Sequence, residues 1–564
     1  MQEEAKPSSS WLAELNRRRV PRIALIYLGV AWTLLQVADL AFPRLGLPDW
    51  TVTALLWVFA AGFPVAVVLA WVFQVVPGGV TRDTGPDTGQ VYRSIAVLPF
   101  DDMSEHRDQA WFAEGIAEDL LNALAQIRTL RVMARTSSFA FKGSGKTVAE
   151  IAQVLDVDSV LEGSVRRAGD RVRITAQLID ARRGHHLWSG TFEREVEDIF
   201  ALQDKVARGI VDALRLELGI AAQQSIVVGT TSDPEAYGAF LRGRAVFDWS
   251  NPARLGEAIE HFQRAVELDP NYAQAWGYLA HATMITPALG HDDRQALQDA
   301  DRAVARALAL DPGLGVALAV SALIVQLRDR DWVRAGVLYR RALTAPDNAS
   351  AVALYSVLFL PQLGRFDEAF ALYREVESRD PLHAGIKVNH GVTLRFAGRA
   401  AEAIAKFEEA IALSPLHVFA WSNLILTYLG LGDVDGAEAV LPRIPEVLRG
   451  IPNIRQRIGQ VYARRGDPRA AEILDAVLAQ TQLLRGRLGL VAGLACDLGR
   501  DELCLDLLEQ AADTLAWSKL FAFEAIPKDS PLQRHPRFQA ALRRIGLDAE
   551  SIAATNRALD AADA

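Results

Sequence analysis

The hydrophobic pattern divides the chain into an apolar start, an alternating middle and a long helical remainder. Ile23–Leu40 and Val52–Val76 are almost continuous apolar runs. Each run is long enough to cross a bilayer of about 30 Å as a helix. Pro43, Gly46 and Pro48 interrupt the connector between them, as in a tight turn. The pattern therefore predicts a two-helix transmembrane hairpin over residues 23–76.

The charges beside the first apolar run predict its orientation. Four arginines lie between residues 17 and 22, and only Arg44 lies in the connector. Because positive charge is retained in the cytoplasm, residues 1–22 are expected to form a cytoplasmic tail. A cleaved signal peptide fits poorly, since no small-x-small site follows the first run and a second run comes directly after it. Two spans would return the chain to the cytoplasm.

A short linker and an alternating region follow the apolar runs. Residues 77–92 are rich in Gly, Thr and Asp and are typical of a flexible linker. The pattern then predicts strands at Ser94–Phe100 and Leu130–Ala134, helices at Ala110–Ile127 and Thr147–Leu155, a meander of three strands from Ser159 to Glu195, and a closing helix at Phe200–Leu218. Residues 93–220 are therefore expected to form a mixed α/β domain.

Several segments of this domain resemble the TolB-like amino-terminal domain of bacterial envelope and signalling proteins. They are IAVLPF (Ile95–Phe100), FAEGIAEDLLNAL (Phe112–Leu124), SVLEGSVRRAGDRVRITAQLID (Ser159–Asp180), LWSGTFER (Leu187–Arg194) and FALQDKVA (Phe200–Ala207). The resemblance implies a mixed α/β fold used for interaction, with no known chemistry. Together with the apolar hairpin it implies a bacterial inner (cytoplasmic) membrane location. The soluble domains are expected in the cytoplasm, with the periplasm as the alternative.

One motif in the α/β region imitates a phosphate-binding loop. Gly143–Thr147 reads GSGKT, but the full pattern requires a glycine where Ala140 stands. A phosphate loop also needs a buried strand before it, and Ser137–Lys142 is a poor strand. We therefore expect a polar turn that leads into the next helix.

The helical remainder repeats every 34 residues. Gly364, Gly398, Gly432, Gly466 and Gly499 follow one another at intervals of 34, 34, 34 and 33 residues. This period, built from helix–turn–helix pairs, is the signature of tetratricopeptide (TPR) repeats.

Small and aromatic residues recur in the same frame, as in Ala403, Phe407 and Ala410, with Pro415 ending that repeat. Trp276 and Trp421 occupy one early position of the first helix. We expect seven or eight repeats and a final capping helix at Ser530–Leu547, so that residues 234–547 form an α-helical solenoid.

A repeat solenoid binds its partners through the concave face formed by the first helices of its repeats. The frame places eight residues on this face: His281, Ile324, Leu354, Leu358, Val392, Arg395, Phe419 and Leu426. The set is mostly apolar. Packing between neighbouring helices explains such residues as well as a hydrophobic peptide-binding groove does. The regular Lys/Asn set that clamps C-terminal carboxylates is missing, so we expect poor binding of such peptides.

Composition and motifs limit the kinds of function that the sequence supports. The formal net charge of −9 disfavours a general nucleic-acid binder, whose affinity comes from neutralised phosphates. The only cysteines, Cys496 and Cys504, lack C-x-x-C spacing and are expected to be small buried side chains. The sequence contains no G-x-S-x-G, H-E-x-x-H or Cys/His metal cluster. We therefore predict a protein with no catalytic or metal site, cofactor or small-molecule substrate.

The expected function is a non-enzymatic, membrane-anchored scaffold that binds a protein or peptide partner through its repeats. The alternative is a regulatory module that recruits a separate signalling protein, such as a cyclase or a transcription regulator. The pairing of a TolB-like domain with TPR repeats resembles the C-terminal halves of some proteins of those two classes. Sequence motifs do not separate the two hypotheses, because both rest on the same binding surface.

Overall fold

A computed structural model describes residues 93–195 and 231–563 with short gaps, and before them only short stretches between residues 31 and 63 and at 73–76 and 79–82. The gaps are residues 105–109, 126, 128–129, 169–170, 182–183, 185, 232, 248–253, 287–291, 346–347, 480–487 and 527–529. The chain divides into two compact units, Met1–Val91 and Tyr92–Ala564. The closing helix predicted at Phe200–Leu218 lies outside the described residues.

The predicted transmembrane hairpin at 23–76 is wrong. Among the described residues, every helix is too short or too polar to cross a membrane. The end of the second predicted span is a strand, β1 (Phe73–Val76), which pairs antiparallel with β2 (Gly79–Arg82). β-branched Val75 and Val76 favour an extended backbone, and Val76 is paired with Gly79 in the register of the two strands. β2 also replaces part of the linker predicted at 77–92. A cytoplasmic side for the folded domains stays a prediction.

A six-stranded mixed sheet forms the first part of the second unit. Its strands are β3 (Arg93–Val97), β4 (Asp101–Asp102), β5 (Leu130–Val132), β6 (Ser159–Ala168), β7 (Arg171–Asp180) and β8 (His186–Glu195). The order is β5-β3-β6-β7-β8, and β4 also pairs with β6. β3 is parallel to β5 and β6, whereas β6, β7 and β8 form the antiparallel meander that the alternating pattern predicts.

Three helices accompany this sheet: α4 (Ala110–Ala125), α5 (Arg135–Phe139) and α6 (Val148–Leu155). Ile116 and Leu120 of α4 are fully buried in one core with the inward side chains of the strands. The GSGKT motif is a turn before α6, and Thr147 and Glu150 cap that helix reciprocally. The polar turn predicted there is confirmed.

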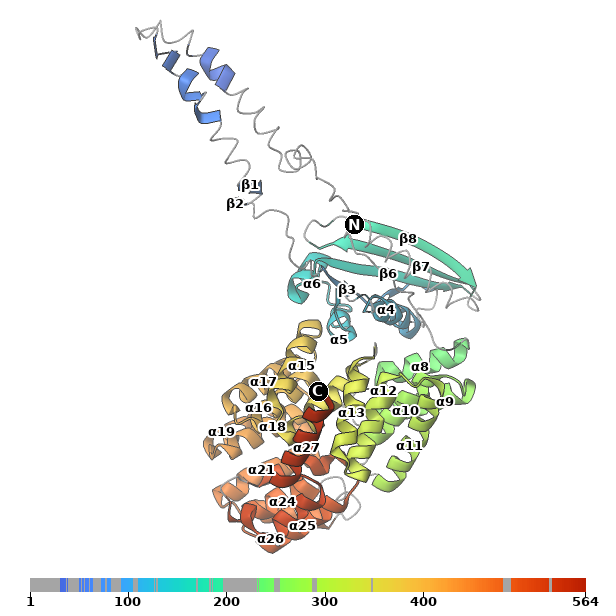
Figure 1. The fold of residues 1–564 in the computed structure, drawn as a ribbon, viewed down its shortest axis with the longest axis vertical. Coiled ribbons are helices and arrows are strands. Elements are labelled where there is room, and N and C mark those ends of the chain that lie inside the picture. The colour runs from blue at the N-terminus through green and yellow to red at the C-terminus, as the bar shows by residue number, and fades with distance from the viewer. Residues whose placement is uncertain are drawn as a thin grey trace, which may run out of the picture. The chain divides into compact units, whose positions relative to one another are not determined.

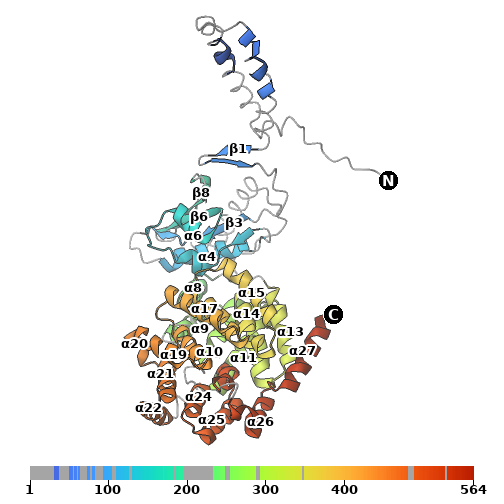
Figure 2. The same ribbon diagram turned by 90° about the vertical axis from the view of Figure 1, so that its left-hand side faces the viewer.

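The described residues from Pro234 onward form a series of helix pairs (Figures 1 and 2). First and second helices pair as α8 (Pro234–Val246) with α9 (Leu255–Leu268), α10 (Ala273–Ile285) with α11 (Asp293–Leu310), α12 (Gly315–Ile324) with α13 (Trp332–Leu343), α14 (Ala349–Leu354) with α15 (Phe366–Arg379), α16 (Ala384–Phe396) with α17 (Ala400–Leu413), α18 (Val418–Gly430) with α19 (Val434–Val440), α21 (Pro452–Arg465) with α22 (Arg469–Leu478), and α24 (Leu488–Asp497) with α25 (Asp501–Asp513). Single π-helical turns, η5 (Val325–Asp329) and η6 (Tyr355–Phe359), extend α12 and α14.

The repeat frame is visible in atomic detail. All five predicted turn glycines adopt φ between 68° and 75°, the left-handed conformation that suits glycine. Trp276 and Trp421 donate the same bond from Nε1, at 3.0 and 2.8 Å, to the carbonyl oxygens of Pro270 and Pro415. Phe407 is fully buried against Gly391, where a Cβ would lie 2.6 Å from its ring. The small and aromatic positions therefore pack as the period predicts.

The C-terminal part folds back onto the middle of the solenoid. After α25 come the 3-10 helices η10 (Trp517–Ala525) and η11 (Pro531–Arg534), then α26 (Pro536–Arg544) and α27 (Ala549–Asp563). α27 lies beyond the predicted end at residue 547. Its Leu559 is fully buried against Gly336 of α13, and Asp560 pairs with Arg365 at 2.7 Å. Trp332 donates to the carbonyl of Ile545 at 3.0 Å.

The α/β domain contacts the solenoid at two separate places. At the first, Glu118 of α4 pairs with Arg244 of α8. At the second, buried Asp380 accepts bonds from the Ser137 backbone N–H at 3.0 Å and hydroxyl at 2.6 Å, and so caps α5. Burial raises the pKa of the Asp380 carboxyl. The two places are separated by the helices from α9 to α14, so the domain bridges several repeats.

Candidate functional site

The eight residues predicted on the concave face all lie on first helices or their extensions. His281 is on α10, Ile324 on α12, Leu354 and Leu358 on α14 and η6, Val392 and Arg395 on α16, and Phe419 and Leu426 on α18. The first five in this order are at most 5% exposed, because they pack between neighbouring helices. Arg395, Phe419 and Leu426 are half-buried. A peptide role for these three stays a prediction, whereas the buried five are core residues.

His281 illustrates why the polar members of the set are not free for a ligand. Its Nδ1 lies 3.2 Å from the Ser350 hydroxyl, and the Phe247 ring meets its ring edge-on at 5.2 Å. Burial, followed by the charge of Arg244, lowers the pKa of His281 to about 4. His281 is therefore neutral at pH 7 and acts as part of the core.

The surface formed by the first helices around Arg395, here named the inner groove, is covered by another segment of the chain. Residues 514–526, the return segment, cross it. Leu515 N–H donates to Asp293 Oδ2 at 2.6 Å, and Lys519 Nζ donates to the Leu327 carbonyl at 2.9 Å. Leu520, Ala522, Phe523 and Ile526 are at most 7% exposed. Burial lowers the pKa of Lys519 to about 8.

The return segment supplies a carboxylate to Arg395. Glu524 Oε2 accepts a bond from Arg395 Nη2 at 2.9 Å, and the side chains are 17% and 13% exposed. The rings of Phe396 and Phe521 meet edge-on at 6.1 Å beside this pair. Because the charge of Arg395 is already neutralised by an internal partner, a ligand at this position has to displace Glu524.

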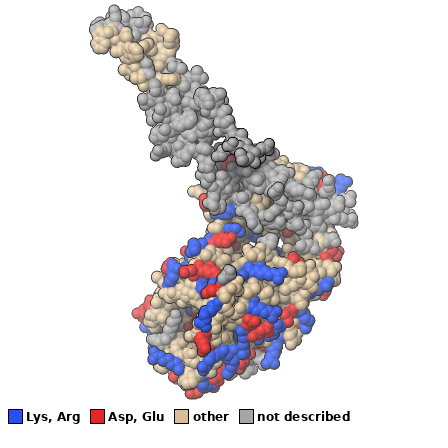
Figure 3. Space-filling model, viewed as in Figure 1, with Lys and Arg blue, Asp and Glu red and all other residues tan. Residues whose placement is uncertain are grey.

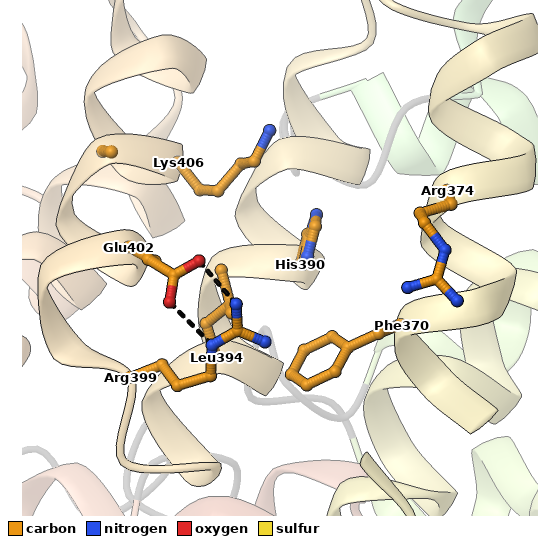
Figure 4. Close-up of a pocket in the computed structure, with 8 residues that line it drawn as sticks. Phe370, Arg374, His390, Leu394, Arg399, Glu402 and Lys406 are labelled. Atoms are coloured by element: carbon orange, nitrogen blue, oxygen red, sulfur yellow. Dashed lines mark hydrogen bonds and ion pairs between the residues drawn. The ribbon is translucent and has the colours of Figure 1, made fainter. Parts of the chain in front are cut away.

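An open pocket lies elsewhere on the same repeats. It has a volume of about 330 Å³ and is lined by Phe370 and Arg374 of α15, His390 and Leu394 of α16, and Arg399, Glu402, Ala405 and Lys406 at the start of and along α17. Figure 4 shows Phe370 and Arg374 on one side, Arg399, Glu402 and Lys406 on the other, and His390 between them. The α15–α17 pocket therefore opens between two second helices.

Ion pairs hold the walls of the pocket in place. Glu377 of α15 accepts bonds from Lys387 Nζ at 2.9 Å, Lys406 Nζ at 3.1 Å and His390 Nδ1 at 2.6 Å. Although burial opposes ionisation, the bonds from His390 and Lys387 prevail and lower the pKa of Glu377 to about 2. The His390 ring also stacks on buried Tyr373, with centroids 4.8 Å apart. The network fixes the rotamers of His390 and Lys406, both of which line the pocket.

The two arginines of the pocket differ in their pairing. Arg399 forms a bidentate pair with Glu402, with N···O distances of 2.7 and 2.6 Å, and stacks over the Phe370 ring at 4.9 Å. Arg374 is exposed, and within the described part of the chain it has no hydrogen bond or ion pair. Its guanidinium faces Phe370 in Figure 4. Arg374 is thus an unsatisfied cation at the edge of a preorganised pocket.

Sequence reasoning missed both features. A signal existed for the return segment: α18 and α21 begin twenty residues after Gly398 and Gly432, so the frame after Gly499 places another first helix near residue 519. η10 begins at Trp517. The pocket gave no such signal, because its residues come from three helices and repeat in no fixed register.

Two families match parts of the chain. The family described as HilA/YgeH-like transcriptional regulator, second domain, matches residues 91–231. Tetratricopeptide repeats match residues 395–456, which include Arg399, Glu402 and Lys406 of the pocket. The chain therefore carries tetratricopeptide repeats, as its 34-residue period predicts, and these repeats are protein-binding modules.

A curated relative matches a third of the chain. The putative adenylate cyclase 3 of Rhizobium meliloti (strain 1021) is 44% identical over 187 residues, which are 33% of this chain and 32% of the relative. The chain thus spans about a third of the length of this relative.

Solved structures with similar helical arrangements are more distant. A human IFIT1 dimer with PPP-AAAA is 14% identical, with 78% of this chain and 94% of that chain covered and a TM-score of 0.42. The peptide-binding TPR protein YrrB is 21% identical, with 33% and 88% covered and a TM-score of 0.22. A TPR protein from Parabacteroides merdae ATCC 43184 is 16% identical, with 49% and 99% covered and a TM-score of 0.29.

Proposed function

We propose that this chain is a non-catalytic regulatory module that recruits a partner protein through its repeat solenoid. The observation that carries the proposal is the α15–α17 pocket, an open and preorganised cavity on the repeats, whereas the inner groove is filled by the return segment. A repeat solenoid supports function by presenting a surface, and the pocket is where that surface offers a concave site with an unsatisfied charge.

The names of the relatives favour a signalling partner over an envelope scaffold. The family that matches residues 91–231 is described as the second domain of a transcriptional regulator, and the 44%-identical relative is named as a putative adenylate cyclase. Both names belong to proteins with a regulatory output. The TolB-like segments at Ile95–Phe100 and Ser159–Asp180 agree with an interaction role, because that resemblance implies no chemistry.

The α/β domain is placed to take part in this role. It contacts α8 through Glu118 and the turn between α15 and α16 through Ser137 and Asp380. The second contact lies one residue beyond the end of α15, the helix that carries Phe370 and Arg374. A partner that shifts α15 would therefore alter the cap on α5, which gives the α/β domain a physical route to sense binding.

Recruitment is tested by crosslinking the full chain in cells and identifying the proteins that co-purify with it. A cyclase, kinase or transcription regulator recovered in stoichiometric amount is the expected result. Recovery of structural envelope proteins alone would favour the scaffold hypothesis. The purified chain is also incubated with ATP and Mg²⁺, and formation of cyclic AMP at a steady catalytic rate would contradict the non-catalytic proposal.

A further inference from the structure

The α15–α17 pocket combines an apolar floor with a cationic rim. Phe370 and Leu394 are buried at its base, at 8% and 2% exposure, and exposed Ala405 also lines it. Arg374, Arg399 and Lys406 supply three positive charges to the lining, and Glu402 supplies one negative charge. The lining is therefore positive in a chain whose formal net charge is −9.

Internal pairing accounts for two of the three cations. Lys406 Nζ is bound by Glu377 and by Glu409 at 3.0 Å, and Arg399 is bound by Glu402. Only Arg374 lacks such a partner among the residues that the structure describes. Some exposed arginines elsewhere in the repeats pair with a carboxylate, as Arg443 does at Glu408 and Arg465 at Glu438, whereas others, such as Arg294 and Arg455, have no such pair among the described residues. On the face shown in Figure 3, basic and acidic side chains likewise alternate over the solenoid. What distinguishes Arg374 from those unpaired arginines is that it lines a cavity.

The size of the cavity limits what it holds. Its volume is about 330 Å³. This space suits a side chain of a polypeptide rather than a folded surface. An arginine fork binds a carboxylate through two parallel bonds.

We propose that the α15–α17 pocket binds a glutamate or aspartate side chain of an extended partner segment, with Arg374 as its bidentate partner. The inference rests on the proposed recruiting function and names the chemistry of the partner. Lys406 contributes positive potential, but the bonds of Lys406 and His390 to Glu377 leave Arg374 as the group that makes the direct contact.

The test measures binding of a fluorescein-labelled peptide to the full chain by anisotropy. The probe alternates Glu with Leu and Phe between Gly–Ser ends, and its control replaces every Glu with Gln. Arg374→Ala removes the proposed contact. Arg379→Ala is the matched control, because Arg379 is an exposed arginine of the same helix that pairs with Glu375 outside the pocket. Circular dichroism checks that both variants fold.

We expect the Glu peptide to bind the wild type and Arg379→Ala equally, and Arg374→Ala at least about tenfold more weakly. The Gln peptide should bind at least about tenfold more weakly to the wild type. Rising salt should weaken the binding of the Glu peptide, because the contact lies at the surface. Equal binding of the Glu peptide to Arg374→Ala and to the wild type would overturn the inference. Equal binding of the Gln and Glu peptides to the wild type would also overturn it. So would displacement of the Glu peptide by a phosphopeptide or an RNA oligonucleotide at a lower concentration than unlabelled Glu peptide requires.

The same variants separate this inference from the proposed function. If the partner recovered by crosslinking is lost from Arg374→Ala and kept by Arg379→Ala, both proposals are supported. If Arg374→Ala still recovers it, the carboxylate contact is refuted and recruitment stands. If the wild type recovers no partner but binds the Glu peptide through Arg374, recruitment is refuted and the carboxylate site stands.

Discussion

The inner groove and the α15–α17 pocket use the same kinds of side chain but differ in what completes them. In the groove, Arg395 lies beside Phe396 and is neutralised by Glu524 of the return segment. In the pocket, Arg374 lies beside Phe370, and the described residues offer it no carboxylate. The difference teaches that concavity alone does not mark a binding site in a solenoid. A site also needs a charge that the chain has left unsatisfied.

Truncating the Phe523 side chain in the return segment should have the largest effect on the free energy of unfolding. Phe523 is buried at 7% exposure and meets Phe538 of α26 edge-on at 5.4 Å. Phe523→Ala leaves a cavity in a packed core, and a loss of about 3–5 kcal/mol in the free energy of unfolding is expected. Urea denaturation followed by circular dichroism measures it. A change below about 1 kcal/mol would mean that the segment is not part of the core.

Removing the salt bridge between Arg395 and Glu524 should lower the free energy of unfolding by somewhat less. Arg395→Ala leaves the largely buried carboxylate of Glu524 without its cation, and we expect a loss of about 2–4 kcal/mol. Adding Glu524→Gln should recover part of this loss, because the largely buried negative charge is then absent. A double-mutant cycle by urea denaturation gives the coupling energy, and additive effects would contradict the pairing.

Acid should weaken the walls of the pocket through Glu377. Its folded-state pKa of about 2 lies below the ordinary value of 4.5. The stabilisation is therefore complete above about pH 4.5 and is lost as the pH falls toward 2, with a magnitude of at most about 3 kcal/mol. The measurement is the free energy of unfolding from pH 6 to 2.5. Glu377→Gln, the matched variant, should lose less stability over this window, and an identical pH profile would contradict the network.

Changing Arg374 should have the smallest effect on folding. Because this side chain is exposed and has no bonded partner within the described residues, Arg374→Ala should shift the free energy of unfolding by less than about 0.5 kcal/mol. Thermal denaturation of the variant and the wild type checks this. A loss above about 1 kcal/mol would show that Arg374 serves the fold, so that its role in binding would need another explanation.

The sequence predicted the repeats well because their determinants are local. A turn needs Gly398 or Gly432 in a left-handed conformation, and close helix packing needs Gly391 under Phe407. Such requirements recur with the period and are readable from one chain. The strand meander was predicted for the same reason, since alternation within Ser159–Glu195 reports the two faces of a sheet.

Contacts between helices that are far apart in the sequence were not predictable. Whether Glu524 reaches Arg395 depends on the rotation added by every repeat between them, and residue spacing does not give this rotation. The pairing of Lys406 with Glu377 likewise depends on how α17 sits against α15. The transmembrane hairpin failed for another reason: hydropathy measures apolar length, whereas Phe73–Val76 pairs with Gly79–Arg82 as a strand.

Hydrogen–deuterium exchange of the full chain, with and without the Glu peptide, compares the two regions most directly. The account predicts slower exchange in residues 366–406 on binding, and unchanged exchange in residues 514–526. The Arg374→Ala variant should show neither effect. Faster exchange of residues 514–526 on binding, without protection of 366–406, would contradict the account, because the peptide would then have displaced Glu524 and entered the inner groove.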